Sequence, residues 1–253
     1  MLKMKLSFLS AACVLSLSAL MPAHATPLVI GGSVEVGNIA GNVFTPSPVG
    51  LDTNGLYTNL SFKLNSGNAQ STSAGLFVLD HKPAIGGGAW SQLLAFCLEP
   101  DVFLQGAGNS FNNPYTVKSV AGAGYSAVSG AISELWGTYR SQVVNDTTAA
   151  AFQVALWELA YGTTDKNLAS GMFQMTSNAT VQGTAQSWLD SLDKGLGTMA
   201  QGLVVLQDNE TNRNNQDLLT QGEVPEPGVL GLLAAGLAGL GLARRRARRQ
   251  RPA

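Results

Sequence analysis

Residues 147–162, TTAAAFQVALWELAYG, constrain the fold of this chain more than any other stretch of its 253 residues. The large side chains recur at helical spacing on two adjacent stripes, Phe152, Leu156 and Leu159 on one and Gln153, Trp157 and Ala160 on the other. A helix that is apolar on both stripes must be buried on most sides. Gln153 carries a carboxamide into this interior, where a polar group must be hydrogen-bonded or used in chemistry.

The rest of residues 26–222 predicts strands around this helix. Alternating or short apolar runs that are typical of strands occur at 56–64, 75–80, 91–99 and 203–206. Weaker strand signals occur at 26–38, 109–117 and 218–219, and the polar segments 42–54, 66–74 and 208–216 are expected to be loops or turns.

Two further segments, 126–140 and 178–193, have apolar residues at helical spacing. Asp146, which follows Asn145, is expected to cap the central helix by accepting from its first-turn amides. The order strands, helices, strands favours an α+β fold. We therefore expect a β-rich, sandwich-like or barrel-like body with a helical insertion of two or three helices.

The first 25 residues have the pattern of a secretory signal peptide. Lys3 and Lys5 precede an apolar run over 6–20, and Ala23-His24-Ala25 forms a cleavage site of the A-x-A type. The predicted organisation is a signal peptide at 1–25, an exported domain at 26–222 and a C-terminal segment at 223–253.

The C-terminal segment has three parts. Pro225, Glu226 and Pro227 precede an uncharged run over 228–243, and an arginine-rich tail follows that run. The run has sixteen residues, at or just below the short limit of the roughly 17–25 residues that span a bilayer, and we expect it to be a transmembrane helix. The arginines would stay in the cytoplasm and leave the domain outside.

This end resembles the PEP-CTERM sorting signal of Gram-negative bacteria. The resemblance implies export by the general secretory route, anchoring in the inner membrane, and cleavage near the motif by an exosortase-type membrane peptidase. The protein would then reach the cell surface or the exopolysaccharide matrix of a biofilm. The tail would be a retention signal made of Arg244, Arg245, Arg246, Arg248 and Arg249.

The charge of the exported domain excludes one class of partner. Removing the two leader lysines, the six C-terminal arginines and Glu226 leaves seven basic residues against fifteen acidic ones, so the part of the chain between the leader and Glu226 is near −8. An acidic body without a basic patch argues against nucleic-acid binding.

Enzyme templates fit the exported domain poorly, and we expect a protein that is not an enzyme. His81 is the one histidine left after the leader, and beside Asp80 and Lys82 it is typical of a solvated loop. Glu99 and Asp101 flank Pro100 and are interpreted as acidic residues at a strand end, although a carboxylate pair can serve glycoside hydrolysis. No metal set and no cofactor motif is found.

Cys97 and Gln153 remain as the pair with plausible chemistry. Cys13 leaves with the leader, so Cys97 is a solitary cysteine in an oxidising compartment. A thiol held against a carboxamide in a dry pocket can displace ammonia and form an internal thioester, which then acylates an amine or a hydroxyl. Taken singly, Cys97 is typical of a buried inert thiol, and Gln153 of a core amide.

The two short motifs around these residues resemble those of bacterial surface thioester domains. Phe96-Cys97 matches the aromatic-cysteine motif on a strand, and the run from Gln153 to Trp157 matches the helix motif, with Phe152 in place of the usual threonine. The resemblance implies a thioester between Cys97 and Gln153, a pocket built from Phe96, Phe152 and Trp157, and covalent adhesion to a surface nucleophile. The alternatives are a biofilm- or exopolysaccharide-associated structural protein without the bond and, ranked last, a secreted glycan-acting enzyme.

Overall fold

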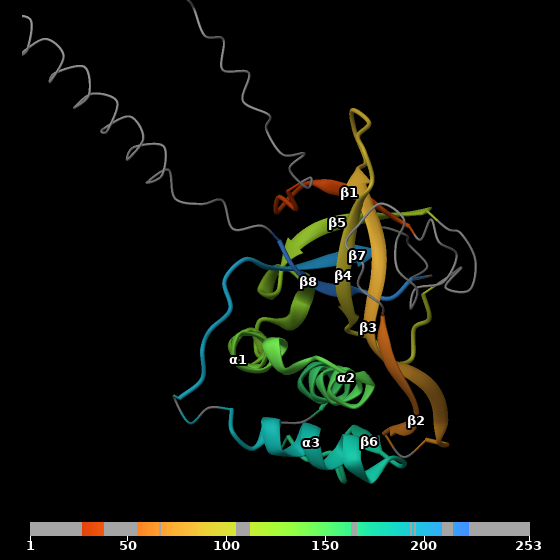
Figure 1. Ribbon diagram of the computed structural model, residues 1–253, viewed down its shortest axis with the longest axis vertical. Coiled ribbons are helices and arrows are strands. Elements are labelled where there is room, and N and C mark those ends of the chain that lie inside the picture. The colour runs from red at the N-terminus through yellow and green to blue at the C-terminus, as the bar shows by residue number, and fades with distance from the viewer. Residues whose placement is uncertain are drawn as a thin grey trace, which may run out of the picture.

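The structure is a computed structural model that describes residues 27–37, 55–65, 67–104, 112–162, 166–192, 194, 196–208 and 215–222. Its strands form one antiparallel sheet in the order β1-β5-β7-β8-β4-β3-β2-β6. An additional pairing of β1 with β3 closes six of the strands into a barrel (Figure 1). The strands are β1 (Ser33–Gly37), β2 (Leu56–Leu64), β3 (Gln70–Pro83), β4 (Ser91–Cys97), β5 (Asn112–Ser119), β6 (Phe173–Met175), β7 (Leu203–Asp208) and β8 (Leu218–Gln221).

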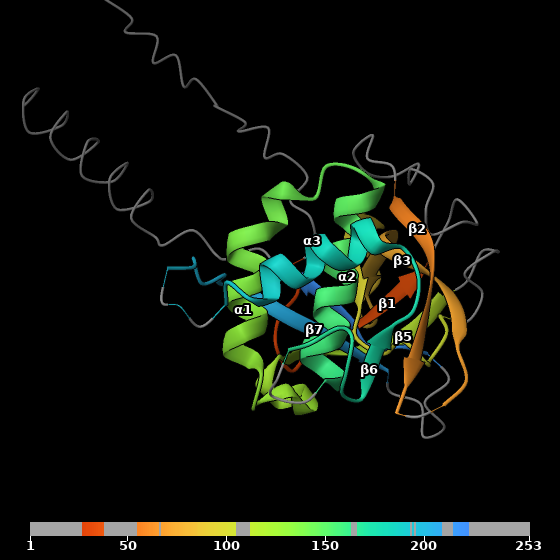
Figure 2. The same cartoon turned by 90° about the horizontal axis from the view of Figure 1, so that it is seen from below.

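The helices follow β5 and lie together on one side of the barrel (Figures 1 and 2). They are α1 (Ser129–Tyr139), α2 (Asp146–Tyr161) and α3 (Ala179–Leu189), with a π-helical turn η1 (Ala121–Tyr125) before α1 and a 3₁₀ turn η2 (Arg140–Gln142) after it. The α+β class, with a β-rich body and a helical insertion, is therefore confirmed, and the body is a barrel.

Helix α2 lies between the barrel and α3 and contacts both (Figure 1). Every residue from Ala149 to Leu159 is buried, which is the environment that the apolar stripes predict. Asn145 caps the helix: its Oδ1 accepts from the backbone N–H of Thr148 at 2.9 Å, and Thr148 Oγ1 accepts from the Asn145 N–H at 3.2 Å. The cap is thus Asn145 and not Asp146, because this reciprocal pair requires the side chain one position earlier.

Strand β3 connects the barrel to the outer strand pair. Its first half pairs with β2, from Gln70 to Leu76, and its second half pairs with β4 on one side and β1 on the other. Gly75 lies where β3 passes β2, and a Cβ atom there would be 1.9 Å from the Leu56 carbonyl oxygen. The close approach of the two backbones requires glycine at this position.

The expected turn over 66–74 was wrong in its second half, because β3 already begins at Gln70. The polar residues at the start of β3 are exposed or half-buried, so they pair with β2 without being placed in the core. Strand β6 was not predicted; it pairs with β2 through Phe173 and Met175, both buried.

No helix in the ranges that the structure describes is long and apolar enough to cross a bilayer. The predicted signal peptide, the motif at Pro225, Glu226 and Pro227, the run at 228–243 and the arginine tail all lie outside those ranges.

Candidate functional site

The fold brings Cys97 and Gln153 into direct contact. Cys97 is the last residue of β4, opposite Leu218 of β8, and Gln153 lies in the middle of α2. The Cys97 backbone N–H donates to Gln153 Oε1 at 2.9 Å, and Gln153 Nε2 donates to the Cys97 carbonyl oxygen at 2.6 Å. Both residues are buried, with exposed fractions of 2% and 0%.

Through these two hydrogen bonds, both the oxygen and the nitrogen of the Gln153 carboxamide have a partner inside the core, as a structural amide requires. The same bonds also hold the acyl group of Gln153 on the residue that carries the thiol, and the Cys97 N–H polarises the Gln153 carbonyl in the way that an oxyanion-hole donor does.

The thiol of Cys97 is held by the chain that follows β4. Sγ donates to the Glu99 carbonyl oxygen at 3.0 Å, and the Glu99 backbone N–H donates to Sγ at 3.3 Å. Burial raises the pKa of the Cys97 thiol well above its ordinary value, and the nearby carboxylates of Glu99 and Asp217 also raise it. The indole of Trp157 and the Glu99 backbone, which favour the thiolate, act in the opposite direction. The thiol is therefore protonated at neutral pH and is not a freely reactive nucleophile.

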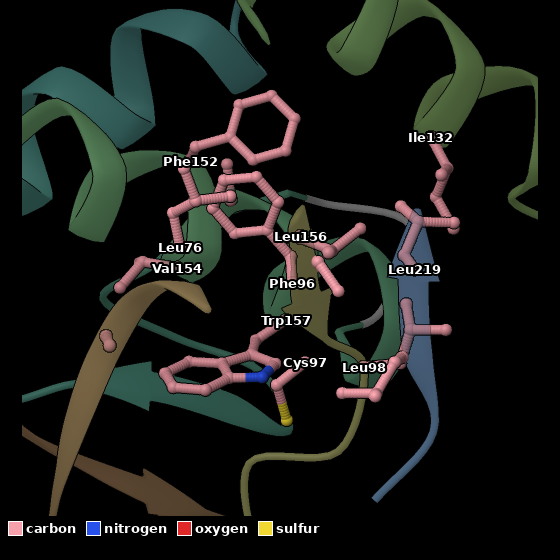
Figure 3. Close-up of a cluster of buried hydrophobic side chains, with 14 of the residues drawn as sticks. Leu76, Phe96, Cys97, Leu98, Ile132, Phe152, Val154, Leu156, Trp157 and Leu219 are labelled. Carbon is pink, nitrogen blue, oxygen red and sulfur yellow. The ribbon is translucent and has the colours of Figure 1, made fainter. Parts of the chain in front are cut away.

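Trp157 lies beside the sulfur, one turn of α2 after Gln153. Figure 3 shows its indole ring against Cys97 with the nitrogen at the Cys97 end. Within the described part of the chain no hydrogen-bond acceptor is found for this buried N–H. A negative charge on the sulfur would accept from it, which is why the indole lowers the pKa of the thiol.

The three aromatic residues expected to form the site occupy two places. Trp157 lines the pocket at the sulfur and packs against Phe62 and Phe173, with ring centroids 5.9 Å away in each case. Phe96 and Phe152 stack on each other at 4.5 Å and pack against Trp136, so they form a core cluster behind the Cys97–Gln153 contact.

A pocket of about 240 Å³ reaches Cys97 from the side of Trp157. Its lining also includes Phe103, which is 68% exposed, so the pocket extends from the buried Cys97 to an exposed side chain. The walls are mixed apolar and polar: Thr72, Ser73, Phe77, Cys97, Glu99, Pro100, Val102, Phe103, Leu104, Trp157 and Gln216.

Glu99 is a residue of this pocket that sequence reasoning placed incorrectly. It is buried rather than solvated, and its Oε2 accepts from the Asp217 backbone N–H at 2.8 Å. Asp101 is exposed and accepts from the Tyr161 hydroxyl at 2.9 Å. The two carboxylates therefore occupy different environments, and only Glu99 lines the pocket. The apolar run that continues to Leu98 was a signal that the chain stays inside beyond the strand end.

His81 was also expected in a solvated loop, and this was wrong. It lies on β3 with an exposed fraction of 4%, and its Nδ1 lies 3.2 Å from the Ser91 carbonyl oxygen. The expectation failed because β3 extends to Pro83, and at His81 it pairs with both β1 and β4.

Comparison with known proteins identifies the C-terminal segment. Residues 223–249 match the family model of the PEP-CTERM protein-sorting motif, which confirms the predicted tail. The motif indicates an exported protein that is anchored in the membrane before an exosortase processes it. No curated protein matches the chain.

One solved structure similar to this chain is the "N-terminal thioester domain of surface protein from Clostridium perfringens". The TM-score is 0.35 at 12% sequence identity, and the match covers 66% of this chain and 100% of that one.

Proposed function

We propose that this chain is a surface- or matrix-directed adhesin whose exported domain forms an internal thioester between Cys97 Sγ and the Gln153 acyl group. The observation that carries the proposal is the double hydrogen bond between the Gln153 carboxamide and the main chain of Cys97. It holds an acyl donor and a thiol in one water-poor core, and Cys97 lines a pocket. The sorting motif supports the destination, where a covalent attachment is useful.

The bond-forming step replaces the amide C–N bond of the Gln153 side chain by a C–S bond to Cys97. The Cys97 sulfur attacks the Gln153 Cδ, the C–N bond to Nε2 breaks, and the thiol proton leaves with the nitrogen as ammonia. The Cys97 N–H stabilises the negative charge that develops on Oε1. The Trp157 N–H would donate to any negative charge that develops on the sulfur. Breaking the Nε2 bond to the Cys97 carbonyl is part of the cost of this step.

The second step attaches the partner. An amine or a hydroxyl that enters the pocket attacks the thioester carbonyl, forms an amide or an ester at Gln153, and returns the proton to the Cys97 thiol. Each molecule reacts once, so the protein is an adhesive device without turnover and needs no cofactor. Burial protects the thioester from water until that nucleophile arrives.

Intact-mass measurement tests the bond. We expect the wild-type protein to be one ammonia lighter than its sequence, and the peptides that carry Cys97 and Gln153 to be recovered joined to each other. Methylamine should add at Gln153 as the N-methyl amide and release one thiol that a denatured sample reveals by alkylation.

The matched control is Cys97→Ala, which keeps the small apolar volume and removes the sulfur. This variant should have the mass of its sequence and take up no methylamine. A wild-type mass equal to its sequence would overturn the thioester. It would leave the second candidate, a matrix-associated structural protein, which is favoured by the fact that the carboxamide and the thiol already have backbone partners.

The sorting route has its own test. Pro225→Ala combined with Pro227→Ala should leave full-length protein in the membrane fraction, because the membrane peptidase would no longer recognise the motif. Fractionation and immunoblotting measure this, with Pro252→Ala as the control for loss of a proline elsewhere in the tail. Release of the double variant at the wild-type rate would contradict recognition through these prolines.

A further inference from the structure

A second pocket, of about 340 Å³, lies apart from the Cys97 site. It is bounded by β3, β4, β8 and the end of α1, and it shares no residue with the pocket at Cys97. Its walls are Leu28, His81, Gln92, Leu93, Leu94, Trp136, Arg140, Thr220, Gln221 and Gly222. Small-molecule sites occupy roughly 300–1,000 Å³, so the volume admits a ligand of monosaccharide size.

Arg140 is the charged residue in this wall that the fold leaves without a counter-ion. Its guanidinium lies 5.8 Å from the ring centroids of both Phe96 and Trp136. Among the residues that the structure describes, no carboxylate pairs with it. Burial lowers the pKa of Arg140.

Three other polar side chains of the pocket are held by hydrogen bonds and carry no negative charge. Trp136 Nε1 donates to Gln221 Oε1 at 3.1 Å, and Gln221 Nε2 donates to the Gln201 carbonyl oxygen at 2.7 Å. Thr220 Oγ1 donates to the Leu94 carbonyl oxygen at 2.8 Å. The walls contain one arginine, held on aromatic faces, and one histidine, His81, but no aspartate or glutamate.

A guanidinium that has lost part of its hydration and has no anionic partner destabilises the folded protein, and a bound anion would offset this cost. Its planar fork matches a carboxylate through two parallel hydrogen bonds, and stacking on Trp136 and Phe96 keeps the fork oriented. A doubly charged phosphate would favour more than one cation, and the walls contain one arginine and no lysine.

We propose that this pocket is a binding site for a carboxylate-bearing small molecule or glycan unit, with Arg140 as the recognition residue. The site does not depend on the thioester, so its test is separate from the test of the adhesion chemistry at Cys97.

The test follows the indole N–H signal of Trp136 in the ¹⁵N-labelled full-length protein, identified by its loss in Trp136→Phe. Glucuronate and glucose form a matched pair of probes that differ in the carboxylate, and acetate supplies the carboxylate without a sugar. We expect glucuronate to shift the Trp136 signal in a saturable way and glucose to leave it in place. A shift with acetate as well would assign the site to carboxylates in general, and no shift with acetate would assign it to sugar acids.

Arg140→Gln should weaken glucuronate binding by about tenfold or more, the loss expected when a charged hydrogen-bond donor is removed. Lys118→Gln removes an equal charge from β5, where Lys118 bonds to Gln207, and should leave binding unchanged. Thermal unfolding of both variants reports whether they are folded. Equal binding of glucose and glucuronate, no shift with either carboxylate, or undiminished binding by folded Arg140→Gln would each overturn the proposal.

Discussion

Trp157→Ala is expected to lower the free energy of unfolding by about 3–5 kcal/mol, the usual cost of truncating a large buried aromatic residue. The indole is 2% exposed and joins α2 to the outer strands through Phe62 of β2 and Phe173 of β6. Denaturant unfolding followed by circular dichroism measures the loss. A loss below about 1 kcal/mol would show that the surrounding side chains collapse into the space.

Trp157→Phe is the matched control, because it keeps an aromatic ring and removes the N–H beside the sulfur. We expect this variant to retain most of the stability that Trp157→Ala loses. If the indole stabilises charge on the sulfur, the fraction of protein that has lost ammonia should fall in Trp157→Phe although the fold is intact. An unchanged fraction would show that the indole acts in packing alone.

Gln153→Met is expected to cost about 2–4 kcal/mol, because it nearly preserves the volume of the side chain and removes both of its hydrogen bonds. The Cys97 N–H and carbonyl oxygen would then lie buried without a partner, and each such group costs about 1–3 kcal/mol. Denaturant unfolding of the variant in the Cys97→Ala background separates this cost from any loss of the thioester. A cost within about 0.5 kcal/mol there would show that water or another group replaces the amide.

Gln153→Glu adds a pH dependence to the same test. An ionised carboxylate would face the Cys97 carbonyl oxygen in the core, whereas a protonated one can donate to it. The folded protein would bind this proton more tightly than the unfolded chain, so the stability of the variant should rise as the pH falls. Equal stability of Gln153→Glu at neutral and acidic pH would contradict the buried hydrogen-bonded contact between residue 153 and the Cys97 main chain.

Much of the helical layer could be predicted because its signals are local. The apolar stripes of residues 147–162 require burial, and α2 is buried continuously from Ala149 to Leu159. The alternation over Leu56–Leu64 gave the bounds of β2, since a half-exposed strand shows its period directly. The early start of β3 and the short β6 have weak local patterns and exist because β2 offers them a partner on each side.

The contact between Cys97 and Gln153 was expected from two short motifs and not from any pattern of hydrophobicity, since 56 positions separate the residues. Sequence reasoning could not find the Arg140 pocket, because residues of β3, β4, β8 and the end of α1 meet there only in the folded protein. It also missed the burial of His81, which depends on the pairing of β3 with β1 and β4. Pairings of this kind are set by the whole sheet, whereas helical periodicity and caps are set within a few residues.

The position of β8 decides how the molecule would carry a pulling force. The strand is the last one before the sorting segment, and it lies between β4 and β7 with hydrogen bonds to both. Tension that enters from the C-terminal side must therefore break two ladders at once instead of peeling one edge strand. Cys97 lies opposite Leu218 in the first of these ladders. A partner attached at Gln153 would be connected to the C-terminal segment through the Cys97–Gln153 hydrogen bonds and the pairing of β4 with β8. Most of the other strands would then lie outside the path of the force.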